Sequence, residues 1–466
     1  MHDDITPWYR EILRDDLSTF IGKTLQTVNP SAAFVPSWHV DLIAEYLQAV
    51  RHGNITRLLI NLPPRSLKSI CVSVAWPAWI LGHHPDSRII AASYSSALSL
   101  KHSLDCRLLV SSSWYREVFP SFSIAPGQNE KHKFVTTSRG FRFATSVGGS
   151  LTGEGGQIVI VDDPLNPRQA MSSHYREQCR SWFDQTVATR LDDKKTGVIV
   201  VVMQRLHEDD LSGHLLAKGG WEHLCIPAVS QQRRAFSAGK ITKVMEAGEV
   251  LQPVRESEAI LARIHRELGG RAFAAQYLQA PLASESSMIR REWIQRWRFM
   301  PAKFDAIIQS WDTGIKAGEG HDPSACLTFG QLGPDHYLID CVMQRVEYPQ
   351  LRRLLMKLAE QSGAQLVMIE DKASGQQLIQ EMRYLLPLPV LACKPEGDKI
   401  SRFSRITPLI EAGQLWLPEE APWLSDFESQ LMAFPQAPHD DAVDALSQYF
   451  GWVQQRAWKQ PRLRLV

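Results

Sequence analysis

Four short apolar runs constrain the fold of this chain more than any other feature. They cover residues 58–62, 88–94, 158–161 and 198–203, and helical stretches separate them. Buried strands of a parallel sheet have this pattern, because helices cover both faces of such a sheet. The pattern therefore predicts a mostly parallel α/β sheet in about residues 33–227. All four runs are far shorter than the ~20 residues of a membrane-spanning helix, so we expect no membrane association.

The length of the chain predicts more than one domain. A single core rarely grows beyond roughly 250–300 residues, and this chain has 466. Later apolar runs predict three strands joined by short turns, a crossover helix and a further strand, which together indicate a mixed sheet. These elements are expected at 306–312, 325–331, 336–342, 349–360 (the helix) and 366–370. The expected division is 1–230, an α/β domain with an N-terminal helical segment; 231–300, a linker or helical subdomain; 301–455, a second α/β domain; and 456–466, a basic tail.

Charge and cysteine content narrow the class of protein. Lys and Arg number 51 and Asp and Glu 50, which excludes a polycationic coating protein but allows a local basic groove. The seven cysteines are scattered without a CxxC pair, so we expect reduced thiols and no zinc site. The first residues lack the basic flank and apolar stretch of a secretory signal, and we therefore expect the protein to act in the cytoplasm.

A candidate phosphate-binding loop follows the first apolar run. Lys68 and Ser69 open a helical stretch there, and in such loops the Lys reaches the β- and γ-phosphate oxygens while the Ser hydroxyl ligates Mg²⁺. Leu62 and Leu67 stand at the two glycine positions of the consensus, so residues with a Cβ must accept a geometry that Gly takes easily. The alternative is a plain strand–turn–helix corner. The other loop residues expected around the phosphates are Arg65 and Ser66, together with Leu67.

Carboxylates end the third apolar run, at Asp162 and Asp163. A buried strand that delivers acids at its carboxyl end is how a parallel sheet places a magnesium partner and a water-activating base beside phosphates. We assign the first role to Asp162 and the second to Asp163, and we expect Gln204, at the tip of the fourth run, to sense the γ-phosphate. An Asp-Pro turn after a strand is the structural alternative.

Five further acidic residues occupy similar places in the second region. Asp312 and Glu370 end predicted strands, and Asp440, Asp441 and Asp444 lie at the start of the last helix, where residues four apart share a face. Converging carboxylates repel one another unless cations lie between them. Two divalent ions ~3.5–4 Å apart would relieve that repulsion and activate a water against a phosphodiester. Taken singly, each residue is better explained as part of a turn or as a helix cap than as a metal ligand.

The chain resembles the large terminase subunits of tailed bacteriophages in six motifs that stand in the same order: PPRSLKS, GGSLTGEGGQIVIVDDP, MQRLHEDDLSG, WDTG, MIED and HDDAVDAL. The resemblance implies an ASCE-type P-loop ATPase domain followed by an RNase H-like nuclease domain with a mixed sheet. It implies Asp312, Glu370 and Asp441 as catalytic metal ligands, assisted by Asp440 or Asp444. Two departures are Leu67, where many members carry Gly, and Asp163, where Glu is usual in the wider ATPase group.

That family drives double-stranded viral DNA into the prohead with ATP and cuts concatemeric DNA with a metal-dependent endonuclease. The resemblance implies ATP and Mg²⁺, with Mn²⁺ also possible at the nuclease site. It implies double-stranded DNA, a portal protein and a small terminase subunit as partners, and a homo-oligomeric ring during packaging. Two alternatives remain open: an RNase H-like nuclease or recombinase whose first domain binds nucleotide without being a motor, and an inactive prophage-derived DNA-binding remnant.

Basic residues supply two further sets of candidates. A cation that stabilises the transferring phosphoryl group is expected among Arg65, Arg139 and Arg142. Candidate contacts to the DNA backbone, which a solvated helix face explains equally well, are Arg290, Arg291, Arg296, Arg298, Lys394, Lys399, Arg402, Arg456, Lys459, Arg462 and Arg464.

Overall fold

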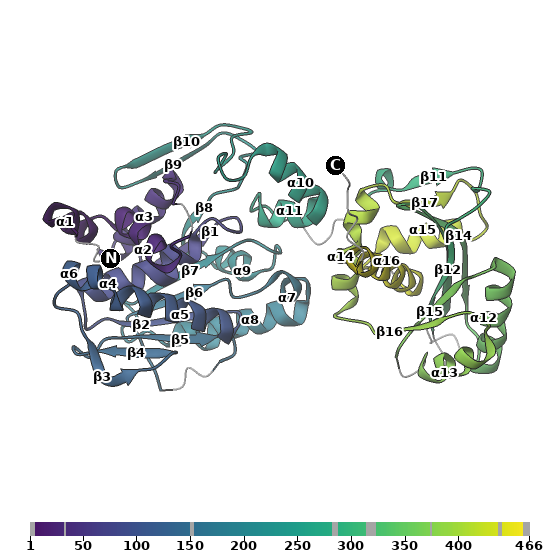
Figure 1. Cartoon of the computed structure of the whole chain (residues 1–466), viewed down its shortest axis with the longest axis horizontal. Helices are drawn as coiled ribbons and strands as arrows, with labels where there is room; N and C mark the ends of the chain where they lie inside the picture. Colours follow the sequence, from purple (N-terminus) through teal and green to yellow (C-terminus); the bar gives the residue numbers. More distant parts are fainter. Residues whose placement is uncertain are drawn as a thin grey trace. The chain divides into compact units, whose positions relative to one another are not determined.

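The computed structural model describes residues 5–31, 34–149, 153–281, 288–313, 323–372, 375–436 and 440–459. The chain forms two compact units (Figure 1): Met1–His265 with Arg271–Ala283, and Arg266–Gly270 with Ser284–Val466. The predicted helix start at His439 and the predicted tail from residue 460 onwards lie outside the described residues. None of the described helices is long and apolar enough to cross a membrane.

An eight-stranded sheet with the order β3-β4-β5-β2-β6-β7-β1-β8 forms the centre of the first unit. The four predicted runs are its strands β2, β6, β7 and β1, which lie side by side and parallel. Strands β3, β4, β5 and β8 were not predicted. The bounds are β1 (Arg57–Asn61), β2 (Arg88–Ser93), β3 (Ile124–Asn129), β4 (Lys133–Thr136), β5 (Phe141–Ser146), β6 (Ile158–Asp162), β7 (Val198–Met203) and β8 (Glu222–Cys225).

Helices cover both faces of this sheet, which is why its strands are apolar throughout. Leu58 and Ile60 of β1 belong to one buried cluster and Leu59 to another, as alternation along a strand requires. The helices are α1 (Pro7–Asp15), α2 (Leu17–Val28), α3 (Trp38–Arg51), α4 (Trp76–His83), α5 (Ser96–Ser111), α6 (Ser113–Val118), α7 (Pro167–Met171), α8 (Ser173–Gln185) and α9 (Leu211–Lys218), with the short η1 (Ile70–Ala75) and η2 (Val187–Thr189).

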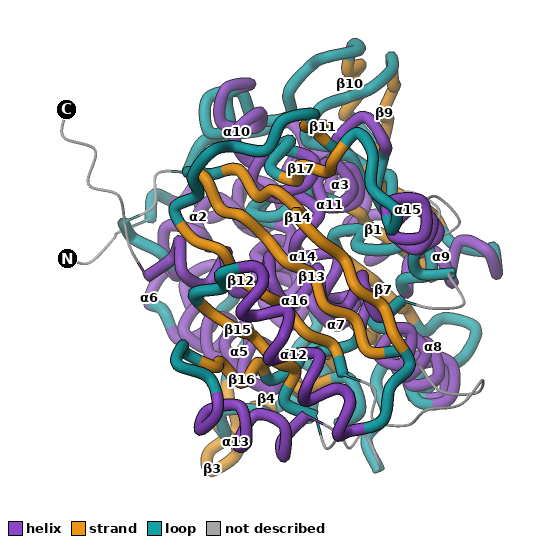
Figure 2. The backbone as a smooth tube through the Cα atoms, turned by 90° about the vertical axis from the view of Figure 1, so that its right-hand side faces the viewer, coloured by secondary structure: helices purple, strands orange, loops and turns teal. Residues whose placement is uncertain are grey.

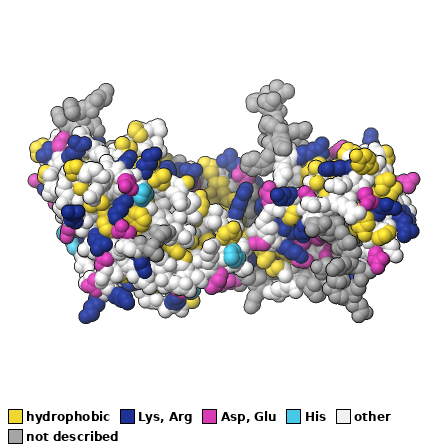
Figure 3. All heavy atoms as spheres, turned by 90° about the horizontal axis from the view of Figure 1, so that it is seen from below, with side chains coloured by type: hydrophobic (Ala, Val, Ile, Leu, Met, Phe, Trp, Pro, Cys, Tyr) yellow, Lys and Arg dark blue, Asp and Glu magenta, His cyan; other side chains and the backbone are white. Residues whose placement is uncertain are grey.

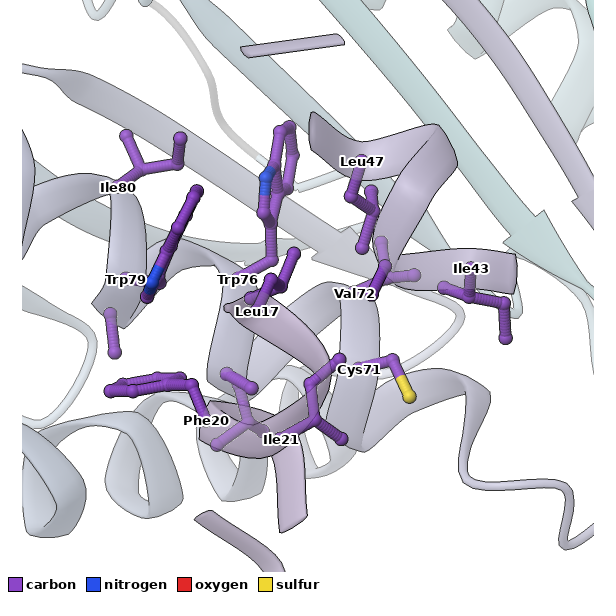
Figure 4. Close-up of a cluster of buried hydrophobic side chains, with 14 of the residues drawn as sticks. Leu17, Phe20, Ile21, Ile43, Leu47, Cys71, Val72, Trp76, Trp79 and Ile80 are labelled. Carbon is purple, nitrogen blue, oxygen red and sulfur yellow. The ribbon is translucent and has the colours of Figure 1, made fainter. Parts of the chain in front are cut away.

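The helical turn after the candidate loop is anchored in the larger of these clusters. Cys71 and Val72 of η1 pack among side chains of α2, α3 and α4, including Phe20 and Trp79 (Figure 4). This stretch is a π-helix, a form that is often found at functional sites. Because residues 71–75 of η1 are buried, this helical turn is fixed relative to β1.

Residues after β8 also pack with the first unit. The antiparallel hairpin of β9 (Arg234–Ala238) and β10 (Ile241–Met245) places Phe236 against Trp38 of α3, with ring centroids 5.5 Å apart. Two helices follow, α10 (Glu258–Leu268) and α11 (Gly270–Gln276).

A seven-stranded sheet with the order β11-β17-β14-β13-β12-β15-β16 forms the second unit. The antiparallel meander β12-β13-β14 joins a parallel pair β12-β15, so the prediction of a mixed sheet is confirmed. Strands β11, β16 and β17 were not predicted. The bounds are β11 (Gln295–Trp297), β12 (Ala306–Asp312), β13 (Ser324–Leu332), β14 (Asp335–Gln344), β15 (Leu366–Glu370), β16 (Val390–Cys393) and β17 (Leu415–Pro418).

Helices also cover both faces of the second sheet. Figure 2 shows α12 in front of β13 and β12, and separate buried clusters join the two helix layers to opposite faces. The ring of Phe329 in β13 stacks on that of Tyr449 in α16 at 3.9 Å, which fixes the last helix on the sheet. The helices are α12 (Tyr348–Ser362), α13 (Gly375–Leu385), α14 (Lys399–Glu411), α15 (Leu424–Ala433) and α16 (Asp441–Lys459), with the short η3 (Arg291–Trp293).

We predict that Phe329→Ala destabilises the second unit by about 3–5 kcal/mol, because a fully buried ring is lost and a cavity remains beneath α16. Urea denaturation followed by far-UV circular dichroism measures this. The control is Phe299→Ala, since the Phe299 side chain is 83% exposed and surface changes usually stay within about 0.5 kcal/mol. A loss below about 1 kcal/mol for Phe329→Ala would contradict the packing described.

Candidate active sites

The loop between β1 and η1 holds two residues in the left-handed region. Leu67 has a φ of 63° and Arg65 a φ of 61°, a conformation that costs a residue with a Cβ about 1–2 kcal/mol. Leu67 thus takes the backbone geometry that was expected at this glycine position of the consensus. Leu62 differs, because it continues the strand and its backbone N–H donates to the carbonyl of Met203. The sequence therefore accommodates a glycine-type loop without glycine.

His39 supports this loop from beneath. Burial lowers the pKa of His39 to about 4, so its imidazole is neutral. Its Nε2 lies 3.1 Å from the carbonyl oxygen of Ser66, and its Nδ1 lies 2.6 Å from Ser37 Oγ. The consistent tautomer donates from Nε2 to the carbonyl and accepts the hydroxyl of Ser37 at Nδ1. From the other side Arg255 donates to the Arg65 carbonyl at 2.6 Å.

Asp162 is buried at the end of β6, directly opposite the start of η1. Ser69 Oγ donates to its Oδ1 at 3.0 Å and Ser73 Oγ to its Oδ2 at 2.7 Å. Burial raises the pKa of Asp162, while the Ser73 hydroxyl and the Lys68 ammonium oppose that rise. A hydroxyl and a carboxylate side by side are hard oxygen donors, which is the chemistry that Mg²⁺ prefers.

Asp163 lies beside the loop lysine. Lys68 Nζ is 3.3 Å from Asp163 Oδ2, and the backbone N–H of Gln204 donates to its Oδ1 at 3.1 Å. Burial raises the pKa of this carboxyl as well, with Lys68 again opposing the rise. The buried Oε1 of Gln204 accepts no hydrogen bond from the described part of the chain. Since β1, β6 and β7 are parallel, their carboxyl ends bring these groups to one edge of the sheet.

A cavity of about 1090 Å³ opens above this edge. A nucleotide fits a space of that size. Trp38 lines it, as does the segment 251–255 from beyond the hairpin. The predicted site residues that line it are Arg65, Ser66, Leu67, Lys68, Ser69, Asp163 and Gln204.

The three candidate cations differ sharply in position. Arg142 is fully buried, donates to the Ser73 carbonyl at 2.9 Å and does not line the cavity. Arg139 is exposed at a turn between β4 and β5 and does not line the cavity. Arg65 lines it, and so does Arg255, which no motif in the sequence indicated.

In the second unit, two strand-end acids lie on neighbouring strands. Asp312 ends β12 and Glu370 ends β15, and these strands pair in parallel with Trp311 opposite Ile369. Burial raises the pKa of Asp312 well above its usual range, and the charges of Glu370 and Asp444 raise it further. The structure therefore brings together one acid from each of β12, β15 and α16.

The start of α16 is fixed against the end of β12. Ser310 Oγ donates to the carbonyl of Ala445 at 2.8 Å, and Gln448 Nε2 donates to Ser310 Oγ at 3.0 Å and to the Trp311 carbonyl at 3.3 Å. Asp441 is buried and precedes Gln448 by seven residues, so helical periodicity places it on the same face of α16.

Cations hold the carboxylates of this site. A possible metal-binding group needs three His, Cys, Asp or Glu side chains with ligand atoms within 4.8 Å of one another. Among the described residues such a group is formed by His207, Glu208 and Asp209, which belong to the first unit. In the second unit, Lys372, Lys399 and Arg402 pair with three of the five predicted ligands. The contacts are Lys372 with Glu370 at 2.7 Å, Arg402 with Asp444 at 2.7 Å and with Glu370 at 4.0 Å, and Lys399 with Asp440 at 2.5 Å and Asp444 at 3.1 Å.

This cation-held set fits divalent metal. Its donors are all carboxylate oxygens, and Asp312 lies among like charges, a condition that Mg²⁺ or Mn²⁺ would relieve. No motif in the sequence indicated Lys372, and Lys399 and Arg402 were predicted as contacts to the DNA backbone. Arg296, another predicted DNA contact, pairs with Glu428. On the face seen in Figure 3, Lys and Arg side chains are interspersed with Asp and Glu side chains.

Comparisons with known proteins bear on the second unit and on the fold of the chain. Residues 309–450 match the family model described as Terminase RNaseH-like domain. A search of curated proteins finds no match to the chain.

The structure is similar to solved structures of a large terminase from a thermophilic bacteriophage. One crystal form gives a TM-score of 0.54 at 11% identity, with 90% of this chain and 100% of that chain covered. The same protein in complex with ADP gives 0.51 at 11% identity, with 90% and 100% covered. In complex with ATP-gamma-S it gives 0.50 at 11% identity, with 89% and 99% covered. At this identity the likeness shows the fold.

We predict that Asp312→Asn stabilises the metal-free protein at neutral pH. The folded pKa of Asp312 lies above its ordinary value of 3.8, so the stability it contributes is complete below that value and is lost as pH rises through the folded pKa. Asn carries no charge at any pH. We expect the melting temperature in EDTA to rise by about 2–4 °C at pH 7, with the difference closing near about pH 4.

The matched control is Asp426→Asn, because Asp426 is exposed on α15 of the same unit. It should leave the melting temperature unchanged at both pH values. A lower melting temperature for Asp312→Asn in EDTA would show that Asp312 is a structural cap and not a strained acid.

Proposed function

We propose that this protein is a terminase large subunit. The premises are that residues 309–450 match the terminase RNase H-like domain family and that the chain has the large-terminase fold. It hydrolyses ATP to move double-stranded viral DNA into a prohead, and it cuts concatemeric DNA with a metal-dependent nuclease. The observation that carries the proposal is that each unit gathers buried acids at the ends of parallel strands, one set beside a lysine-bearing loop and a cavity.

In the first unit Lys68 and Asp163 have complementary tasks. Before nucleotide binds, the ammonium and the carboxylate neutralise each other at 3.3 Å. The phosphates of ATP would draw Lys68 towards the β- and γ-oxygens, which frees Asp163 to accept a proton from the attacking water. The Gln204 N–H keeps the Asp163 carboxylate oriented during this change.

Ser69 and Asp162 would hold Mg²⁺, since their oxygens already lie together. When bound, the ion neutralises charge on the β- and γ-phosphates. The free Oε1 of Gln204 lies at the same edge and is suited to report the γ-phosphate to the rest of the chain. Arg65 is the candidate that stabilises the transferring group within its own subunit, because it lines the cavity. The ADP complex of the thermophilic-phage large terminase supports nucleotide binding at this fold.

In the second unit Asp312, Glu370 and Asp441 would act as catalytic metal ligands, with Asp440 or Asp444 assisting. These residues would hold two Mg²⁺ or Mn²⁺ ions, whose chemistry there would be to activate a water and to stabilise the leaving oxygen of the phosphodiester. The protein positions the carboxylates through the pairing of β12 with β15 and through the hydrogen bonds of Ser310 and Gln448 to α16.

The partners follow from this assignment. A packaging motor acts on double-stranded DNA together with a portal protein and a small terminase subunit, and we propose that this chain assembles as a homo-oligomeric ring on the prohead. Its place of action is the cytoplasm of the bacterial host. The four-part division at residues 230, 300 and 455 remains a prediction for where motor, linker, nuclease and basic tail meet.

We predict that Lys68→Ala lowers DNA-stimulated ATP hydrolysis by about 10²–10³-fold, because the buried ammonium that meets the phosphates is lost. Phosphate release measures the rate, and far-UV circular dichroism confirms the fold. The control is Lys218→Ala on α9, which removes a surface pair with Asp184 and should leave the rate unchanged. ATP hydrolysis that survives Lys68→Ala would remove the motor assignment.

We predict that wild-type protein nicks and linearises plasmid DNA with Mn²⁺ or Mg²⁺, and that Asp312→Asn reduces this by at least about 10²-fold, since a metal ligand is lost. Gel electrophoresis of cut plasmid measures it, with Asp426→Asn as control. Cleavage without any ATP hydrolysis would favour the nuclease or recombinase with a non-motor first domain. Absence of both ATP hydrolysis and plasmid cleavage would favour the inactive DNA-binding remnant.

A further inference from the structure

One face of α14 carries two cations aimed at the acidic cluster. Lys399 and Arg402 lie three residues apart, which places them on neighbouring turns of the same helix face. Arg402 Nη2 meets Asp444 Oδ1 at 2.7 Å, and Lys399 Nζ meets Asp444 Oδ2 at 3.1 Å. Lys399 also meets Asp440 Oδ1 at 2.5 Å. Both oxygens of Asp444 are therefore engaged, and Lys399 bridges two carboxylates.

The two cations differ in how freely they can leave. The Arg402 side chain is 12% exposed and also donates to the carbonyl of Gly397, so it is fixed. The Lys399 side chain is 45% exposed and its partner Asp440 25%, so the ammonium can turn into water at small cost. Lys399 is thus the displaceable counter-ion and Arg402 the permanent one.

A divalent ion bound by Asp440 and Asp444 needs the oxygens that Lys399 contacts. The Lys399 ammonium and the ion then compete for these oxygens. A divalent ion brings two positive charges to the carboxylates, and this weakens their attraction for the ammonium. On release, the ammonium stands at the first turn of α14 beside the cutting site. A freed cation in that place attracts a DNA phosphate.

We propose that Lys399 is a resident counter-ion of the nuclease site that metal displaces onto the DNA backbone, so that metal binding itself creates a phosphate contact. The proposal rests on the nuclease function proposed above and deepens it by naming the group that couples metal to DNA. It reconciles the expectation that Lys399 contacts DNA with its position in the structure, where it pairs with Asp440 and Asp444.

Lys399→Gln tests the proposal through two readouts of opposite sign. Calorimetry on the full chain without nucleotide should show Mn²⁺ bound about two- to fivefold more tightly, because the competitor is gone. Fluorescence anisotropy with duplex DNA and Ca²⁺ should show DNA bound about two- to fivefold more weakly, because the released cation is gone. A purely structural lysine would weaken both. Lys399→Arg should return the affinities for Mn²⁺ and for DNA towards those of the wild-type protein.

The matched control is Arg405→Gln, two turns into the same helix, where Arg405 pairs with Glu396 and not with a candidate ligand. It should change neither affinity. The tightening of Mn²⁺ by Lys399→Gln should also shrink between about 0.1 and 1 M salt, as the Debye length falls from ~10 to ~3 Å.

The outcomes separate the two proposals. If wild-type protein cleaves DNA and Lys399→Gln binds Mn²⁺ no more tightly than wild type, the counter-ion role is wrong and the nuclease function stands. If Mn²⁺ binds more tightly but DNA affinity is unchanged, the transfer to the backbone is wrong. If wild-type protein shows no Asp312-dependent Mn²⁺ binding and no cleavage, the nuclease function fails, and the counter-ion role with it.

Discussion

Burial of carboxylates at the carboxyl ends of parallel strands is the constraint on which both units depend. A strand end at the edge of a sheet is a rigid place from which to present an acid, but a buried anion without a partner is costly. Each unit answers with a cation from a neighbouring element: Lys68 for Asp163 in the first, Arg402 of α14 for Glu370 in the second. The positions of the loop and of α14 follow from that requirement.

The central strands could be predicted because their burial on both faces leaves a continuous apolar run. The strands that were missed lie mostly towards the edges of the sheets, where the pattern fades. β8 and β16 are four residues each, and β17 pairs with β14 over only two residues. Such strands are set by their neighbours in the sheet, and a short stretch of sequence does not carry that information.

The candidate sites were predictable in residue type and less so in geometry. Motif spacing indicated Lys68 and Asp162, but not that Arg65 joins Leu67 in the left-handed region. Nor could it indicate Arg255, because a residue from a distant segment enters a cavity only once the hairpin and the 251–255 stretch have packed. The order of acids along the chain identified a helix start, while the contacts of Ser310 and Gln448 that orient this helix are not visible in the sequence.

The near-equality of 51 basic and 50 acidic residues has a local counterpart in the second unit. From the sequence alone, a basic residue near a nuclease motif is interpreted as a DNA contact, because the sequence shows its charge but not the acidic side chain that it pairs with in the fold. In the structure, that cation has a nearer anion, the acid it neutralises. Metal reverses the local sign, because each divalent ion adds two positive charges to the same carboxylates. On the proposal that metal releases Lys399, the cations that the metal frees would govern binding to DNA at such a site, and the total charge of the chain would not predict it.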